Sequence, residues 1–181
     1  MAVEIEKKYR LTPEQASYVE DELAAAAANF AGEEFEENTI YGGGVLDEIA
    51  GIIRIRRIGT KSILTFKQRI PNDSDLKHQI EHESEIADAT SVAAMLSELK
   101  LVPRVIYEKR RKTWTFKSVE IVLDELPFGL FMEIEGSITQ IKEAEMILGI
   151  EDFETEHQTY PSLTAKLGKR VGDVIESRFE N

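Results

Sequence analysis

The sequence has no cysteine and an excess of acidic residues, and both facts exclude whole classes of function. Without cysteine there is no disulfide scaffold, no thiolate metal site and no cysteine nucleophile. The 34 Asp and Glu outnumber the 22 Lys and Arg, so the formal net charge is −12. Because nucleic acids and anionic membranes would repel such a chain, we expect neither a nucleic-acid polymer nor a membrane as its partner.

Long hydrophobic runs are also missing. None approaches the roughly 20 residues that a membrane-spanning helix needs, and the acidic, alternating start of the sequence is not typical of a signal peptide. We therefore expect a cytoplasmic protein. The 181 residues, of which 42% are hydrophobic, predict a single globular domain over residues 1–181. The oligomeric state, monomer or homodimer, stays open.

Alternation of polar and apolar residues dominates the sequence and predicts β-strands along most of it. Short turns join most of these strands, which is typical of an antiparallel sheet in an α+β fold. The strands are expected at residues 3–10, 34–41, 51–58, 62–69, 78–86, 104–117, 119–126 and 130–137. Helices are expected at 12–29, 91–101, 138–148 and 160–179, the last with a break near Gly168 or Gly172.

The polar faces of these strands carry residues of like charge at a spacing of two. Arg54 and Arg56 share one strand face, and Glu133 and Glu135 share another. For any one strand, a solvated face of an ordinary antiparallel sheet is the simpler interpretation. However, like charges at this spacing lie about 7 Å apart and repel one another. Such rows indicate a site in which bases hold phosphate oxygens and acids hold divalent metal.

A closed barrel with a polar interior would place all of these charged faces around one cavity. Seven or eight strands are the number at which a barrel holds one small ligand. The side chains expected inside are Glu4, Glu6, Lys8, Arg10, Arg54, Arg56, Lys67, Arg69, Glu81, Glu83, Glu85, Lys109, Arg111, Asp124, Glu133 and Glu135. The apolar residues expected outside, beneath helices, are Ile53, Ile55, Leu64, Phe66, Ile121 and Leu123.

Motifs in these strands resemble those of the CYTH superfamily, also called triphosphate tunnel metalloenzymes. Glu4-Ile5-Glu6-Lys7-Lys8 resembles its ExExK signature. Motifs that resemble its RxR, TxK, ExE, KxR, LD…GxFxEIE and SYxxL elements follow in the family's order, at 54–56, 65–67, 81–83, 109–111, 123–135 and 160–163. Thr159 replaces the Ser of the last motif. The resemblance spans residues 4–167 and implies an α+β fold, an eight-stranded antiparallel closed β-barrel with helices packed on the outside.

The resemblance further implies a tunnel that binds a small-molecule triphosphate with Mg²⁺ or Mn²⁺, both of which suit hard carboxylate oxygens. The expected metal ligands are Glu4, Glu6, Glu133 and Glu135. The expected phosphate-binding residues are Lys8, Arg54, Arg56, Lys67, Lys109 and Arg111. The expected catalytic residues are Glu4, Glu6, Lys8, Glu81, Glu83 and Asp124, of which the last three hold a second metal, orient water or pair with an arginine.

Arg56 is expected to contact phosphate and not to pair with Glu81 or Glu83. In an empty tunnel its charge would then be opposed by neighbouring Arg54 and Lys67.

Three functions share this set of residues. The first is hydrolysis of tripolyphosphate or of an organic triphosphate such as thiamine triphosphate, which we favour because nothing in the sequence indicates adenine recognition. The second is the class IV adenylate cyclase reaction, which converts ATP to cyclic AMP and pyrophosphate. The third is a non-catalytic module that binds nucleotides or polyphosphate. Two departures from the family pattern, at Thr39-Ile40-Tyr41 and at Gln79, leave the organic part of the substrate open.

Overall fold

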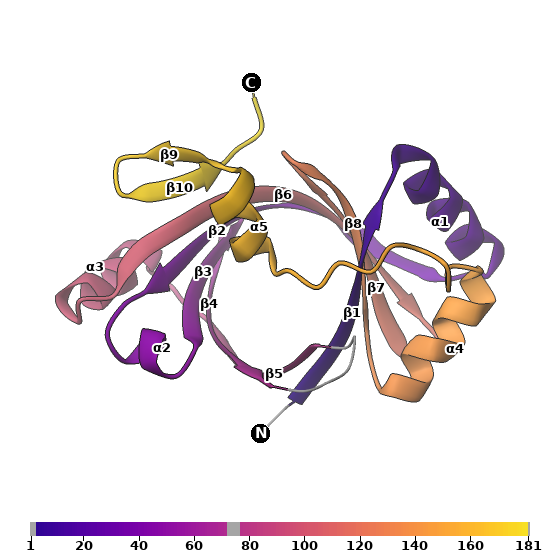
Figure 1. Ribbon diagram of the computed structural model, residues 1–181, viewed down its shortest axis with the longest axis horizontal. Helices are drawn as coiled ribbons and strands as arrows, with labels where there is room; N and C mark the ends of the chain where they lie inside the picture. Colours follow the sequence, from indigo (N-terminus) through magenta and orange to yellow (C-terminus); the bar gives the residue numbers. More distant parts are fainter. Residues whose placement is uncertain (1–2, 72–76, 181) are drawn as a thin grey trace.

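A computed structural model describes residues 3–71 and 77–180, with backbone only at residues 3, 4, 77 and 78. Its central feature is a strongly curved antiparallel sheet (Figure 1). Eight strands build it: β1 (Val3–Leu11), β2 (Asn29–Gly42), β3 (Gly51–Ile58), β4 (Lys61–Ile70), β5 (Lys77–Glu85), β6 (Val102–Phe116), β7 (Val119–Leu126) and β8 (Gly129–Glu135). The α+β class and the antiparallel eight-stranded sheet are as predicted.

The strands pair in the order β2-β3-β4-β5-β1-β8-β7-β6, and β2 also pairs with β6. This last ladder runs from Asn29 opposite Thr115 to Gly42 opposite Val102. β2 begins five residues earlier than predicted because residues 29–33 also pair with β6, where a register shift between Phe30 and Gly32 interrupts the alternation. Among the described residues, the ladder between β1 and β5 is the shortest of the eight, with four residue pairs.

Helices lie against the outer surface of the curved sheet (Figure 1). They are α1 (Pro13–Ala25), α2 (Val45–Glu48), α3 (Ala89–Glu98) and α4 (Ile138–Leu148), and a fifth helix, α5 (Tyr160–Leu167), lies elsewhere. Side-chain oxygens of Thr12, Asp88 and Ser137 accept backbone N–H groups at the first turns of α1, α3 and α4, which fixes where these helices begin. None of the described helices is long and apolar enough to cross a membrane.

Two apolar cores fill the space between the sheet and the outer helices. In one core, α1 and α4 cover the outer faces of β1, β6, β7 and β8, where Ile121 and Leu123 are buried. In the other core, α2 and α3 cover β2, β3 and β4, where Ile55 is buried and Ile53, Leu64 and Phe66 pack against it. The predicted outward orientation of these six residues is therefore confirmed. Full burial of a side chain such as Ile55 or Ile121 contributes about 1.5–3 kcal/mol.

A third apolar core lies on the inner face of the sheet. Ile40, Tyr107 and Phe131 contribute to it from β2, β6 and β8, and α5 adds Tyr160 and Leu163. The first turn of α5 thereby reaches the interior of the curved sheet, whereas the other helices pack on its outside (Figure 1).

The prediction of a helix over 160–179 is wrong beyond Leu167. Residues 169–177 form a hairpin of β9 (Lys169–Val171) and β10 (Val174–Ser177), and β10 pairs in parallel with β6. Gly172 adopts φ +62°, a conformation that favours glycine, so Gly172-Asp173 makes a tight turn. At Gly168 an added Cβ would lie 2.6 Å from the Thr164 carbonyl oxygen. Because glycine has no Cβ, the backbone can pass this close to the helix end as it leaves α5.

Candidate functional site

A cavity of about 530 Å³ lies on the inner face of the curved sheet. Alternation along the strands points every second side chain into it, which is why charged residues from distant parts of the sequence meet there. Of the thirteen predicted site residues, eleven line the cavity: Glu6, Lys8, Arg54, Arg56, Lys67, Glu81, Glu83, Lys109, Arg111, Glu133 and Glu135. Asp124 lies behind this lining. The side chain of Glu4 is outside the described residues.

Two of the other charged residues that we expected inside do not line the cavity. Arg10 forms an ion pair of 3.0 Å with Glu156, in the loop after α4. Glu85 is exposed near the end of β5. Both lie at strand ends, where the alternation continues beyond the part of the sheet that encloses the cavity. Arg69 does line it.

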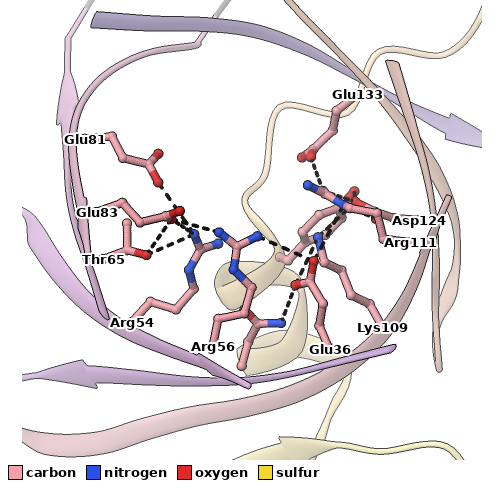
Figure 2. Close-up of polar contacts among 12 residues, drawn as sticks. Glu36, Arg54, Arg56, Thr65, Glu81, Glu83, Lys109, Arg111, Asp124 and Glu133 are labelled. Carbon is pink, nitrogen blue, oxygen red and sulfur yellow. Dashed lines mark hydrogen bonds and ion pairs between the residues drawn. The ribbon is translucent and has the colours of Figure 1, made fainter. Parts of the chain in front are cut away.

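One group of polar side chains comes from β3, β4 and β5 (Figure 2). Arg54 donates to the hydroxyl of Thr65 at 3.2 Å, and Thr65 donates to Glu83 at 3.0 Å. Arg56 donates to the same Glu83 oxygen at 2.8 Å. Lys67 forms an ion pair with Glu81 from the facing position of the β4–β5 ladder. Each basic residue here therefore lies beside a carboxylate.

A second group, from β6, β7 and β8, faces the first one (Figure 2). Arg111 donates to both oxygens of Asp124, at 2.7 and 2.5 Å, and also to Glu133 at 2.8 Å. Lys8 of β1 lies 3.1 Å from another oxygen of Glu133. Such bidentate arginine–carboxylate pairs fix the orientation of the guanidinium group. Asp124 is thus placed as the support of Arg111, one of the roles that the sequence left open for it.

Glu36, which the sequence reasoning missed, lies between the two groups. It is fully buried, with 0% of its surface exposed, and its oxygens are 3.5 Å from Arg56, 3.5 Å from Lys109 and 3.9 Å from Arg111. Asn38 donates a further hydrogen bond at 3.0 Å. Burial raises the pKa of Glu36, but the three cations outweigh burial and bring it to about 2. Alternation of Glu34, Glu36 and Asn38 in the sequence could have indicated an inward acid, but no recognised motif drew attention to it.

Lys109 and Arg111 respond to the same burial in opposite ways. Burial, and the charge of Arg111 beside it, lower the pKa of Lys109 to about 8, although Asp124 and Glu36 partly compensate. For Arg111, the carboxylates of Asp124, Glu133 and Glu36 outweigh burial and hold its pKa well above the ordinary value. Lys109 is therefore a cation whose charge changes near neutral pH, whereas Arg111 stays charged.

The expectation that Arg56 avoids pairing with acids is wrong. Its guanidinium contacts Glu83 and Glu36, and these carboxylates raise its pKa despite burial. The sequence motifs did not reveal Glu36, and they gave no distance between Arg56 and Glu83. Arg56 therefore has both a structural role in the described state and a position from which it faces the cavity.

Buried N–H groups in this region lack acceptors. The Nε atoms of Arg54 and Arg56 are buried, and the described residues offer them no hydrogen-bond partner. A buried donor without an acceptor costs about 1–3 kcal/mol. An anion in the cavity is the kind of ligand that such donors favour.

Acidic residues gather where β1, β8 and β7 run side by side. Glu135 is directly opposite Glu6 on one side and Glu120 on the other, and all three line the cavity. Burial raises the pKa of Glu135, and the charges of Glu120 and Glu6 raise it further. A hard divalent cation would relieve this repulsion, so the donor chemistry fits Mg²⁺ or Mn²⁺. Within residues 5–71 and 79–180, no three such side chains already converge on one point.

A family model described as the CYTH domain matches residues 2–162 of the sequence. The chain belongs to the CYTH family. Comparison with curated protein sequences gave no match. The hairpin of β9 and β10 lies after the residues that match the CYTH model, so it is an addition to the part that defines the family.

Several solved structures share the CYTH fold of this chain. The PH1012 protein of Pyrococcus horikoshii OT3 is 22% identical with a TM-score of 0.77, over 88% of this chain and 98% of that chain. The PH1819 protein of the same organism is 23% identical with a TM-score of 0.71, over 90% and 98%. HpAC1 from Hippeastrum, described as a proposed adenylyl cyclase with a dominant triphosphatase activity, is 18% identical with a TM-score of 0.72, over 95% and 98%. At these identities the likeness establishes the fold.

Proposed function

We propose that this CYTH protein is a divalent-metal-dependent phosphoryl-transfer enzyme that binds a triphosphate in its cavity. Its reaction is the hydrolysis of tripolyphosphate or of an organic triphosphate such as thiamine triphosphate. The observation that carries this proposal is the meeting of all six predicted phosphate-binding side chains in one cavity, beside a row of acids. The six are Lys8, Arg54, Arg56, Lys67, Lys109 and Arg111.

Phosphoryl transfer suits such a site because it asks the protein mainly for positioning and charge neutralisation. A linear triphosphate carries its charge along its whole length, so bases from opposite walls hold it at several points. Arg54 and Arg56 offer planar guanidinium groups that bind phosphate through paired N–H groups. The cavity volume of about 530 Å³ is within the range of about 300–1,000 Å³ that small-molecule sites occupy.

In this proposal Glu4, Glu6, Glu133 and Glu135 hold Mg²⁺ or Mn²⁺. When bound, the metal neutralises phosphate oxygens and so favours attack on phosphorus. Glu133 now contacts Lys8 and Arg111. Glu81 and Glu83 hold Lys67, Arg54 and Arg56 toward the cavity and are available to orient the attacking water.

We also propose that the eight strands form a closed tunnel. The pairing of β2 with β6 supports this, because each of the eight strands then has a neighbour on both sides. Closure of the sheet reduces the access of water to the inward-facing side chains. The electrostatic contacts among these side chains are therefore stronger. Amide hydrogen exchange should then show protection along both edges of all eight strands.

A substrate panel tests the proposed reaction. Tripolyphosphate, thiamine triphosphate and ATP are incubated with Mg²⁺ or Mn²⁺, and released phosphate, pyrophosphate and cyclic AMP are measured. Release of phosphate that stops with a chelator and returns with metal supports the hydrolase. Cyclic AMP and pyrophosphate from ATP would instead identify an adenylate cyclase. Binding of tripolyphosphate without turnover would identify a non-catalytic module, and turnover without divalent metal would refute the proposal.

A further inference from the structure

The side chain of Tyr160 lies against the second group of polar side chains, between Lys8 and Asp124. Tyr160 is the first residue of α5, where the hydroxyl of Thr159 accepts the backbone N–H of Ser162 at 3.3 Å and starts the helix. Only 5% of Tyr160 is exposed, yet it lines the cavity. A tyrosine buried so deeply is ordinarily a core residue. The contacts of its ring with the rings of Tyr107 and Phe131 fit that role.

Its contacts with charged groups go beyond packing. The ammonium of Lys8 lies 3.6 Å from the centre of the Tyr160 ring, well within the distance of about 6 Å for a cation–π contact. Lys8 also donates to the backbone carbonyl of Gln158 at 3.3 Å. The segment that starts α5 therefore holds Lys8 at two points. Because Lys8 is only 2% exposed, solvent screens this contact little.

The hydroxyl of Tyr160 contacts another residue of the same group. It donates to Asp124 at 2.8 Å, and Asp124 accepts both N–H groups of Arg111. Burial and the charge of Asp124 keep the pKa of Tyr160 well above its ordinary value, so the hydroxyl keeps its proton at neutral pH. Asp124 has few ways to rotate while these donors hold it.

The C-terminal hairpin keeps Tyr160 in this place. Leu163 and Thr164 of α5 are buried, and β10 pairs with β6 so that Ser177 lies opposite Tyr107. Arg178 then joins Glu37 and Glu108 at 2.6 and 2.8 Å on the outside of the sheet. The hairpin thus fixes α5 against the strand that carries Lys109 and Arg111.

We propose that Tyr160 is a positioning residue of the phosphate-binding site: its ring holds Lys8 in the cavity, and its hydroxyl holds Arg111 through Asp124. The role rests on the proposed function of the cavity. It makes α5 part of the site, because the first residue of this helix links Lys8 and Arg111, which come from strands that are far apart in the sequence. The two halves of the role are separable, since a phenylalanine keeps the ring and loses the hydroxyl.

Two variants of Tyr160 and one control test the proposal. Tyr160→Phe removes the hydrogen bond to Asp124 and should weaken tripolyphosphate binding about tenfold, as expected for a hydrogen bond to a charged group. Tyr160→Leu also removes the cation–π contact and should weaken binding about fivefold more. Leu96→Ala, the control, removes a buried side chain of α3 from a core that contains neither Tyr160 nor its partners. It should lower the melting temperature and leave affinity unchanged.

Calorimetry with tripolyphosphate measures affinity, and a thermal melt measures stability, for all four proteins. If Tyr160 were only a core residue, affinity would follow melting temperature across the variants, with Leu96→Ala affected like the others. That pattern would overturn the proposal.

A second measurement separates this proposal from the proposed function. The ring of Tyr160 should shift the NMR signals of the Lys8 side chain in the protein without ligand. Tyr160→Phe should preserve that shift and Tyr160→Leu should abolish it. If the wild type fails to bind tripolyphosphate, the proposed function fails, and the Lys8 signals still decide whether Tyr160 positions Lys8. Signals that do not move in Tyr160→Leu would overturn the positioning role.

Discussion

Replacing Glu36 by Gln should destabilise the empty protein and tighten triphosphate binding at the same time. The buried carboxylate lies within 4 Å of Arg56, Lys109 and Arg111. In the empty protein it balances their charge. A bound triphosphate would do the same, so Glu36 competes with the substrate for these three residues.

The stability cost follows from the pKa of Glu36, which falls from 4.5 to about 2 because the three cations outweigh burial. That difference corresponds to about 3 kcal/mol, at the lower end of the about 3–5 kcal/mol found when one partner of a buried ion pair is removed. For a domain of about 150–250 residues, this predicts a melting temperature about 6–12 °C lower.

The pH dependence has a definite sign. Because folding lowers the pKa of Glu36, the carboxylate contributes its full stabilisation above pH 4.5, and that contribution is lost as the pH falls toward 2. Glu36→Gln lacks this contribution at every pH. The stability difference between wild type and variant should therefore be constant above pH 4.5 and should shrink below it.

Urea unfolding across this pH range, with and without tripolyphosphate, measures both effects. Glu37→Gln is the matched control, because Glu37 is the next residue of β2 and pairs with Arg57 and Arg178 on the outside. Its loss should cost less than about 1 kcal/mol. Equal destabilisation by the two substitutions would refute the reasoning. Weaker tripolyphosphate binding in Glu36→Gln would show that Glu36 orients the cations and does not compete with phosphate.

Three further predictions concern the residues proposed to bind the metal and the phosphate groups. Glu6→Gln should lower activity at least about tenfold together with metal affinity, which a Mn²⁺ titration measures, and unchanged Mn²⁺ dependence would contradict the assignment of Glu6. Arg56→Ala should weaken substrate binding by about ten- to a hundredfold. It should also lower the melting temperature, since Arg56 pairs with Glu36 and Glu83. Normal affinity with lower stability would mean that Arg56 has a purely structural role. Tripolyphosphate binding without metal should weaken above pH about 8, where Lys109 loses its proton. Lys109→Arg should remove this pH dependence. If affinity depends on pH in the same way in both proteins, Lys109 is not the source of the dependence.

Most of the strand faces could be predicted from the sequence because a strand turns each second side chain to the same side. Once Arg54 and Ile55 alternate, one of them must face the cavity and the other the helices, and the structure places them so. Family motifs then indicated which of the polar faces matter. This combination is why most of the predicted site residues lie around one cavity.

The ion pairs inside the cavity could not be predicted in this way. Arg56 contacts Glu83 across two ladders and Glu36 from the neighbouring strand, and the distances depend on how strongly the sheet curves. The hairpin after α5 was missed for a different reason. Residues 169–177 form two short strands, of which β10 pairs with β6 and β9 with β10, and local alternation over so few residues does not distinguish them from a helix.

The contact between Lys8 and the carbonyl of Gln158 joins residues 150 positions apart. During synthesis β1 therefore leaves the ribosome long before the segment that holds its lysine exists. Contacts of such separation slow folding, because a long loop must close before they form. The cavity acquires its final charge arrangement only when almost the whole chain is available. An incomplete chain would carry the acids and bases of β1 to β8 without Tyr160, so the proposed competence to bind phosphate would arrive as a late event in folding.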